Sequence, residues 1–90
     1  MNKNSKEFLN ATDYVKKLNS TPTNNELLSL YGYYKQATCG NNKNKQPSLI
    51  NFKGREKWNS WEKNKDMSVH NCEVEYIKLV NTLIKNYGVI

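Results

Sequence analysis

The sequence predicts an all-α fold, a single domain of four helices. Apolar residues recur at intervals of three and four in four separate segments, which is the period of an amphipathic helix, whereas no segment shows the sustained alternation typical of a strand. The chain has 90 residues, of which 37% are hydrophobic, so it can bury only one small core. No repeat or linker divides it, and we expect one domain over residues 1–90.

The first two helices follow from spacing and from start and stop signals. The first is expected over about residues 5–18, with its apolar positions at Phe8, Ala11, Val15 and Leu18. The second begins after Thr23, because Thr23 and Glu26 fit a capping box. Its apolar stripe contains Leu27, Leu30, Tyr31 and Tyr34, with Leu28 and Ala37 beside it. Gly40 is a suitable residue to end this helix.

The segment from Gly40 to about Lys53 is predicted to be an irregular connection. It is rich in asparagine and contains Pro47. It also carries an apolar patch, Leu49-Ile50 with Phe52, which we expect to pack back onto the domain. A connection of this length is usually functional or disordered.

The last two helices complete the prediction. The third is expected over about residues 54–65, with Trp58 and Trp61 on one face as core anchors. Asp66 and Met67 interrupt the helical pattern, and Ser68 is a suitable N-cap for the fourth helix. That helix carries a long apolar stripe and is closed by Gly88. Its stripe contains Val69, Cys72, Tyr76, Val80, Leu83 and Tyr87.

The charge of the chain narrows the kind of partner. Fourteen basic residues stand against eight acidic ones, giving +6, and Arg55 is the one arginine. Lysine meets phosphate as a point charge, whereas base edges favour the arginine fork, so this composition favours a phosphate-bearing partner over a duplex read by sequence. Enrichment in lysine and asparagine can also reflect an A+T-rich coding sequence, and charge alone leaves the choice open.

Other classes of protein are disfavoured by what the sequence lacks. It has no run of about 20 apolar residues for a membrane span and no apolar segment near its start for a secretory signal. His70 is the one histidine and no CxxC motif occurs, which argues against a metal site and against common hydrolytic catalysis. Cys39 and Cys72 are expected to be free, buried thiols, and His70 an exposed residue.

Three residues on the second helix form the most informative cluster. Tyr31, Tyr34 and Lys35 have the spacing i, i+3 and i+4, so they share one face. Two phenols and an ammonium group can stack on an aromatic ligand and donate to its phosphate oxygens. On spacing alone, the preferred explanation is that the tyrosines are core aromatics.

The residues around this cluster resemble the acyl-CoA-binding proteins. Residues 31–40 read YGYYKQATCG and resemble the family signature YxxYKQATxG. The resemblance continues through Pro47, FKGREKWNSW at 52–61 and KDMS at 65–68, and it ends with Tyr76 and the pair Tyr87-Gly88. It spans almost the whole chain and implies an up-down-down-up four-helix bundle. It also implies a non-catalytic carrier of long-chain fatty acyl-CoA without metal or cofactor.

The resemblance implies a role for particular residues. Lys35 and Lys57, with Tyr31, are expected to meet the phosphates of CoA. Tyr34 is expected beside the adenine, and Tyr76 over the ribose and the start of the acyl chain. The remaining expected contacts are Lys16 near the pantetheine and, as weaker candidates for the acyl groove, Phe8, Leu27 and Leu28.

Several positions depart from the family pattern. Gln46 and Ser48 flank Pro47 where arginine and glycine are usual, and Asn41 replaces an aspartate. Glu56 stands between Arg55 and Lys57, and we expect it to point to a different face from Lys57. Thr12 and Asn24 lie near the expected acyl groove. These changes leave the preferred chain length open.

We therefore expect a cytoplasmic, monomeric carrier that makes at most transient contact with membranes and does not bind nucleic acid. The alternative is a basic helical module that binds nucleic acid, with Trp58 and Trp61 as a stacking platform. An enzyme is the third possibility, but no catalytic group has a suitable partner in the sequence. Salt-dependent binding to nucleic acid would distinguish the alternative from the carrier.

Overall fold

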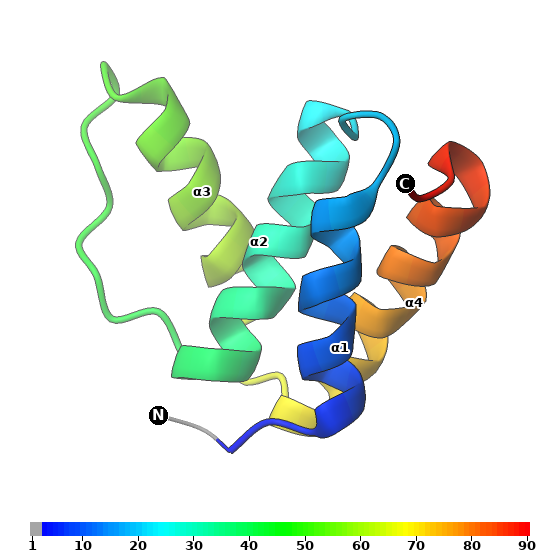
Figure 1. Ribbon diagram of the computed structural model, residues 1–90. Helices are drawn as coiled ribbons and strands as arrows, with labels where there is room; N and C mark the ends of the chain where they lie inside the picture. The colour runs from blue at the N-terminus through cyan, green and yellow to red at the C-terminus, as the bar shows by residue number, and fades with distance from the viewer. Residues whose placement is uncertain (1–2) are drawn as a thin grey trace.

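The computed structural model describes residues 3–90 and contains four α-helices in a bundle (Figure 1). They are α1 (Lys6–Tyr14), α2 (Asn24–Cys39), α3 (Phe52–Glu62) and α4 (Val69–Tyr87), with a short 3₁₀ turn, η1 (Val15–Lys17), directly after α1. In Figure 1 the helices run up, down, down and up in chain order. Within residues 3–90 the only β-type pairing is an isolated bridge between Leu18 and Val89. The predicted all-α class is confirmed.

The predicted caps at the starts of α2 and α4 are confirmed. The Thr23 hydroxyl accepts from the Glu26 amide at 3.2 Å, and the Glu26 carboxylate accepts from the Thr23 amide at 2.8 Å. This reciprocal capping box satisfies two amides that have no partner inside the helix. At α4, the Ser68 hydroxyl accepts from the Asn71 amide at 3.0 Å. Local side-chain chemistry thus fixes where both helices begin.

Glycines end both of these helices in the left-handed region, as predicted. Gly40 has φ of +78° and Gly88 has φ of +75°, a conformation that glycine adopts without steric cost. The Gly88 carbonyl then accepts from the Asn19 amide at 2.9 Å, and the Ile90 amide donates to the Lys17 carbonyl at 2.8 Å. The end of the chain therefore pairs with the segment that leads from η1 to α2.

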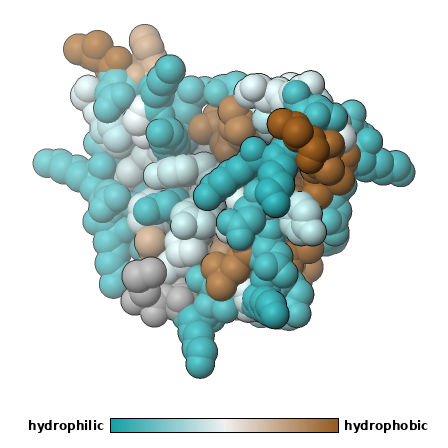
Figure 2. Space-filling model, viewed as in Figure 1, coloured by the Kyte–Doolittle hydropathy of each residue, from teal (hydrophilic) through white to brown (hydrophobic). Residues whose placement is uncertain are grey.

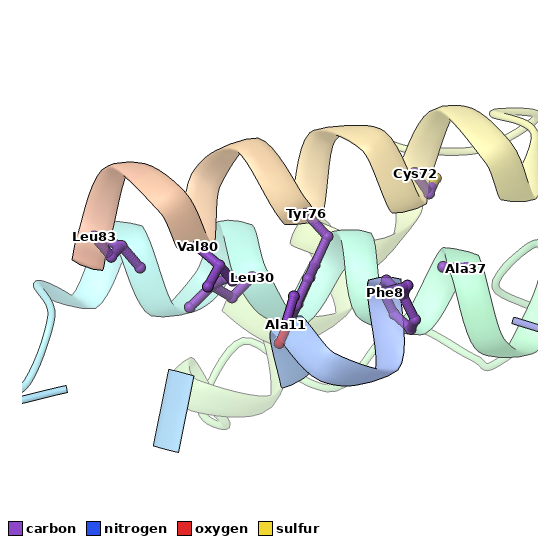
Figure 3. Packing of buried hydrophobic residues seen from close by; sticks show 8 residues of the cluster. All are labelled: Phe8, Ala11, Leu30, Ala37, Cys72, Tyr76, Val80 and Leu83. Carbon is purple, nitrogen blue, oxygen red and sulfur yellow. The ribbon is translucent and has the colours of Figure 1, made fainter. Parts of the chain in front are cut away.

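The main core lies between α1, α2 and α4. Figure 3 shows Tyr76, Val80 and Leu83 directed from α4 toward the other two helices. Leu83 is fully buried and Val80 is 1% exposed. The rest of this buried cluster is Phe8, Ala11, Leu30, Ala37 and Cys72. Every one of these eight residues comes from α1, α2 or α4, so α3 stands outside the cluster.

The third helix instead packs on α2 alone. The two backbones meet closely at Gly32, where a Cβ atom would lie 2.3 Å from the Ser60 carbonyl oxygen. Trp61 is buried and its indole donates to the Gly40 carbonyl at 2.8 Å. Half-buried Trp58 donates to the Asn44 carbonyl at 2.8 Å. The tryptophans hold the 40–51 connection against α3, and Trp61 also fills the junction with α2.

Three predicted helix boundaries were wrong. The first helix keeps α geometry only to Tyr14 and tightens into η1, rather than continuing to Leu18. The third helix begins at Phe52, two residues early, because the Asn51 side chain accepts from the Gly54 amide at 3.0 Å and caps it. It ends at Glu62 rather than residue 65, because the chain tightens into turns and Asp66 then takes a positive φ of 69°.

Two predictions of burial were also wrong. Leu49, Ile50 and Phe52 do not pack back onto the domain but are exposed, because the connection that carries them is held along the outer side of α3. Cys39 is free but exposed, since it lies at the last position of α2. The predictions for Cys72, a free and buried thiol, and for exposed His70 are confirmed.

Candidate functional site

An aromatic cluster joins three helices on one side of the bundle. Phe8 of α1 lies under Tyr34 of α2, with their ring centroids 6.0 Å apart, and under Tyr76 of α4 at 4.9 Å. The two tyrosine rings are 6.4 Å apart. Phe8 is fully buried, whereas Tyr34 is 42% exposed. The cluster therefore has a closed base and one open aromatic ring available to a ligand.

A pocket of about 260 Å³, the aromatic pocket, opens over this cluster. Its tyrosines are Tyr31, Tyr34 and Tyr76, and its apolar wall is formed by Val15, Pro22, Leu27 and Leu30. Burial, and to a smaller extent the neighbouring Tyr34, raises the pKa of the Tyr76 phenol to about 12. Tyr76 is thus a neutral hydroxyl at physiological pH, able to donate a hydrogen bond.

Two further pockets continue along the junction of α2 and α3. The lysine pocket, about 330 Å³, is lined by Asn24, Leu27, Leu28, Tyr31, Lys53, Glu56 and Lys57. The tryptophan pocket, about 240 Å³, includes Tyr31, Lys45, Pro47, Lys57, Trp58 and Trp61. Tyr31 lines all three pockets and Leu27 lines two. The pockets are therefore neighbouring parts of one groove that is apolar at one end and basic at the other.

The lysines of this groove have aromatic neighbours. The Lys57 ammonium lies 5.7 Å from the centroid of the Tyr31 ring, and the Lys35 ammonium lies 4.8 Å from that of Trp61. Within residues 3–90, one pair of opposite charges has a nitrogen–oxygen distance below 4 Å, Glu75 with Lys78 on the other side of α4. The positive charges along α2 and α3 are thus available to an anionic ligand, and the rings hold them in place.

A larger pocket between α2 and α4 suits an anion poorly. This polar pocket, about 360 Å³, is lined by Glu26 and Glu75, and its lysine, Lys78, is the one paired with Glu75. The Glu26 carboxylate accepts from the Tyr87 hydroxyl at 2.7 Å, which with the Thr23 amide lowers the pKa of Glu26. Because Glu26 stays charged and bonded within the fold, the groove around Tyr31 is the better candidate.

Comparison with known proteins shows the family of the chain. The family model described as "Acyl CoA binding protein" matches residues 5–80. The chain belongs to the acyl-CoA-binding protein family. The acyl-CoA-binding protein of Saccharomyces cerevisiae is 46% identical over 74 residues, covering 82% of this chain and 85% of that protein. Acyl-CoA-binding protein homolog 1 of Caenorhabditis elegans is 38% identical over 81 residues, covering 90% and 94%.

Solved structures of acyl-CoA-binding proteins share the fold. Acyl-CoA-Binding Protein 2 of Oryza sativa aligns with a TM-score of 0.85 at 35% identity, covering 89% of this chain and 87% of that one. The solution structure of the yeast protein aligns with a TM-score of 0.75 at 43% identity, covering 93% and 98%. The family resemblance stated from the sequence motifs is confirmed.

The groove brings together most of the residues expected from the acyl-CoA-binding family. Tyr31, Tyr34 and Tyr76 line the aromatic pocket, and Lys57 lines the lysine and tryptophan pockets. Lys35, which follows Tyr34 on α2, does not line any of the three pockets, but its ammonium lies over Trp61 of the tryptophan pocket.

Two expected residues lie to one side of the groove. Lys16 is exposed on η1 beside Val15, which lines the aromatic pocket, but Lys16 does not line any of the pockets itself. Phe8 lies below the groove, in the core, rather than along it.

Some of the acyl-groove candidates, and some of the positions that depart from the family pattern, line the groove, whereas others do not. Leu27 and Leu28 line the groove, and so does Asn24. Thr12 does not, and its hydroxyl donates to the Leu9 carbonyl at 2.7 Å.

Glu56 was expected to point to a different face from Lys57, yet both residues line the lysine pocket. Adjacent helical positions are about 100° apart, and this pocket is wide enough to include both.

Sequence reasoning missed two basic residues of the groove. Lys45, in the 40–51 connection, lines the tryptophan pocket. Lys53 lines the lysine pocket with Lys57. It lies four residues before Lys57, so both are on one face of a helix. The prediction that α3 begins at Gly54 hid this signal. Trp58 and Trp61 both donate their indole N–H to the 40–51 connection, and Trp61 is only 7% exposed, which leaves little surface for a nucleic-acid stacking platform.

Within residues 3–90, no group of three or more His, Cys, Asp and Glu side chains is placed to hold a metal ion. The same residues contain no helix with the length and apolar character needed to cross a bilayer.

Proposed function

We propose that this protein binds long-chain fatty acyl-CoA esters and buffers and carries them in the cytoplasm as a non-catalytic monomer of one domain. One observation carries the proposal. Tyr31 and Leu27 line both the aromatic pocket and the lysine pocket, so apolar and basic surfaces meet in one groove, as a thioester with an acyl chain and a phosphorylated nucleotide requires.

The nucleotide end of the ligand matches the basic residues and open rings. We assign the CoA phosphates to Lys57, Lys35 and Tyr31, and the adenine to the exposed ring of Tyr34. Among the described residues, neither Lys57 nor Lys35 forms an ion pair with a carboxylate, so both ammonium groups are available to phosphate oxygens. Lys53 adds a further cation, whereas Glu56 weakens the field on the same pocket.

The acyl end of the ligand matches the apolar wall. We assign the first part of the chain to the neighbourhood of Tyr76 and the remainder to Leu27 and Leu28, with Phe8 supporting the tyrosines from below. Lys16, beside Val15, is assigned to the pantetheine region. A buried methylene contributes about 0.8 kcal/mol, so a dozen of them contribute about 10 kcal/mol before ordering costs. Exposed ion pairs contribute about 0–1 kcal/mol each. The chain therefore dominates affinity, and the nucleotide determines identity.

Calorimetric titration with palmitoyl-CoA, CoA and palmitate tests the proposal. Palmitoyl-CoA is expected to bind far more tightly than CoA, which lacks the chain, and than palmitate, which lacks the nucleotide. Lys57→Ala and Lys35→Ala are each expected to weaken palmitoyl-CoA binding by up to about fivefold, the loss of one exposed ion pair worth about 1 kcal/mol. Lys85→Ala, an exposed lysine in the last turn of α4, is the matched control and should bind normally.

Two results would contradict the assignment. Equal or absent binding of all three ligands would exclude an acyl-CoA carrier. If Lys57→Ala and Lys85→Ala bind palmitoyl-CoA equally well, the phosphate end does not lie at the lysine pocket. A gel shift with nucleic acid at physiological salt, whose affinity falls steeply as salt rises, would favour the nucleic-acid module instead.

A further inference from the structure

A group of highly exposed apolar residues lies at the turn before α3 and at the first position of that helix. The exposed fractions are 73% for Leu49, 86% for Ile50 and 74% for Phe52. Figure 2 shows hydrophobic side chains protruding at the upper left, where Figure 1 has the turn that leads into α3. Scattered single apolar residues are normal on a surface, but a contiguous protruding group marks an interaction site.

The fold holds this turn in its exposed position. The Arg55 guanidinium donates to the Pro47 carbonyl at 2.9 Å, and the Trp58 indole donates to the Asn44 carbonyl at 2.8 Å. Asn51 caps α3, and its amide donates to the Ser48 carbonyl at 3.1 Å. Leu49 and Ile50 are thus presented between two anchored segments, and the connection cannot fold them back without breaking these bonds.

Positive charge is concentrated along the segment that contains this turn. Residues 43–57 contain five basic residues and one acidic residue, Glu56, which gives +4 of the chain's total of +6. The basic residues are Lys43, Lys45, Lys53, Arg55 and Lys57. Their number falls within the four to eight clustered cations typical of segments that recognise anionic lipids. The contacts of Arg55 and Trp58 keep the two halves of this segment side by side.

We propose that the segment 43–57 is a docking surface for an anionic phospholipid bilayer. Leu49 and Ile50 enter the interface between headgroups and acyl chains, and the lysines meet the headgroup phosphates and carboxylates. One weak signal gives only marginal membrane binding, whereas an apolar insertion and a basic patch acting together bind more firmly, and a protruding apolar turn inside a basic segment supplies both. Nucleic acid would use the charge but not the aliphatic side chains.

The docking surface overlaps the candidate groove. Lys53 and Lys57 belong to the segment and also line the lysine pocket. Contact through Leu49 and Ile50 therefore brings the basic end of the groove to the membrane surface, where an amphipathic ligand is exchanged. This last consequence rests on the proposed function, whereas docking itself requires no bound ligand.

Sedimentation with lipid vesicles tests the docking, using the full chain without acyl-CoA. Vesicles of phosphatidylcholine with about a quarter phosphatidylserine should bind the protein, and pure phosphatidylcholine vesicles should bind it far less. The double variant Leu49→Ser/Ile50→Ser should lower the partition coefficient on anionic vesicles by about tenfold or more. Lys43→Ser/Lys45→Ser should lower it by about tenfold.

The matched control is Ile90→Ser, because Ile90 is 91% exposed and lies at the other end of the molecule from the turn. It should leave the partition coefficient unchanged. Each variant should unfold at the same temperature as the parent chain in a thermal melt, which shows that its fold is intact. An unchanged calorimetric titration of palmitoyl-CoA with Leu49→Ser/Ile50→Ser separates docking from ligand binding.

Three outcomes would overturn the proposal. The parent chain fails to bind anionic vesicles, or the Leu49→Ser/Ile50→Ser variant binds them as well as the parent does. In the third outcome, analytical ultracentrifugation shows self-association that this variant loses, while vesicles bind neither protein; the turn is then an interface between copies of the chain.

Discussion

The helices α1, α2 and α4 are joined by an apolar core, whereas α3 and the connection before it are joined to α2 by a close backbone approach and by hydrogen bonds. Leu83, Val80 and Phe8 in the first region are 1% exposed or less. In the second region, Leu49 and Ile50 are mostly exposed, and the connection is held by polar contacts such as those of the Trp58 indole and the Arg55 guanidinium. The candidate groove lies where the two regions meet at Tyr31. Stability and the basic half of the groove therefore depend on different parts of the chain.

Truncation of one leucine in each region provides the strongest test of this difference. Leu83→Ala is expected to lower the free energy of unfolding by about 2–5 kcal/mol, because it leaves a cavity in a fully buried site. Leu49→Ala removes the same atoms from an exposed turn and should change it by less than about 0.5 kcal/mol. Urea denaturation monitored by circular dichroism measures both. Equal losses would mean that the turn is part of the cooperative core.

A smaller effect is expected at the contact between the regions. In Gly32→Ala the new methyl group meets the Ser60 carbonyl oxygen, which belongs to the backbone and cannot rotate away. Overpacking of this kind costs about 1–3 kcal/mol, partly offset by a gain of about 1 kcal/mol in helix propensity. Because α3 packs only on α2, hydrogen exchange should increase in α3 more than in α4.

Ser29→Ala is the control for Gly32→Ala. Ser29 lies one turn earlier on α2 and lines the polar pocket toward α4, so its loss should leave the exchange of α3 unchanged. Faster exchange spread equally over α3 and α4 in Gly32→Ala would show that the two regions unfold as one unit.

How well the sequence predicted each region follows the same division. The starts of α2 and α4 depend on side chains within three residues, such as Thr23 with Glu26, and these local patterns are visible in the sequence. The exposure of Leu49 and Ile50 was not predictable, because it depends on where Arg55 and Trp58 hold the connection. An apolar pair in a polar loop reads the same whether it packs inward or outward.

The candidate site shows a similar limit. Helical spacing and the family motif predicted that Tyr31, Tyr34 and Lys57 belong to one groove, since each lies on a helix with a recognisable face. Lys53 was missed because the start of α3 was placed two residues late. That Glu56 also lines the lysine pocket was not predicted, because the width of a pocket depends on the separation of two helices, which no local pattern records.

The smallest expected effect concerns a polar tether within the apolar region. The side-chain amide of Asn4 donates to the Glu73 carboxylate at 2.8 Å, and the backbone amide of Ser5 donates to it at 3.0 Å. These two bonds tie the start of α1 to α4. Burial of Glu73 raises the pKa of its carboxyl, but these hydrogen bonds and nearby His70 outweigh burial, so the pKa is lowered from 4.5. The tether's contribution is therefore complete above pH 4.5 and is lost as pH falls through the lower pKa of the folded state.

Glu73→Gln should lower the free energy of unfolding by about 1 kcal/mol at neutral pH, because an amide oxygen accepts these bonds less strongly than a carboxylate. The difference from the parent chain should shrink as pH falls below 4.5, since acid protonates Glu73 in the parent and leaves glutamine unchanged. Glu75→Gln, which removes only the exposed 3.6 Å pair with Lys78, is the control and should keep the acid dependence of the parent. If Glu73→Gln loses stability on acidification as steeply as the parent does, the core region relies on its apolar packing alone and the tether adds nothing to it.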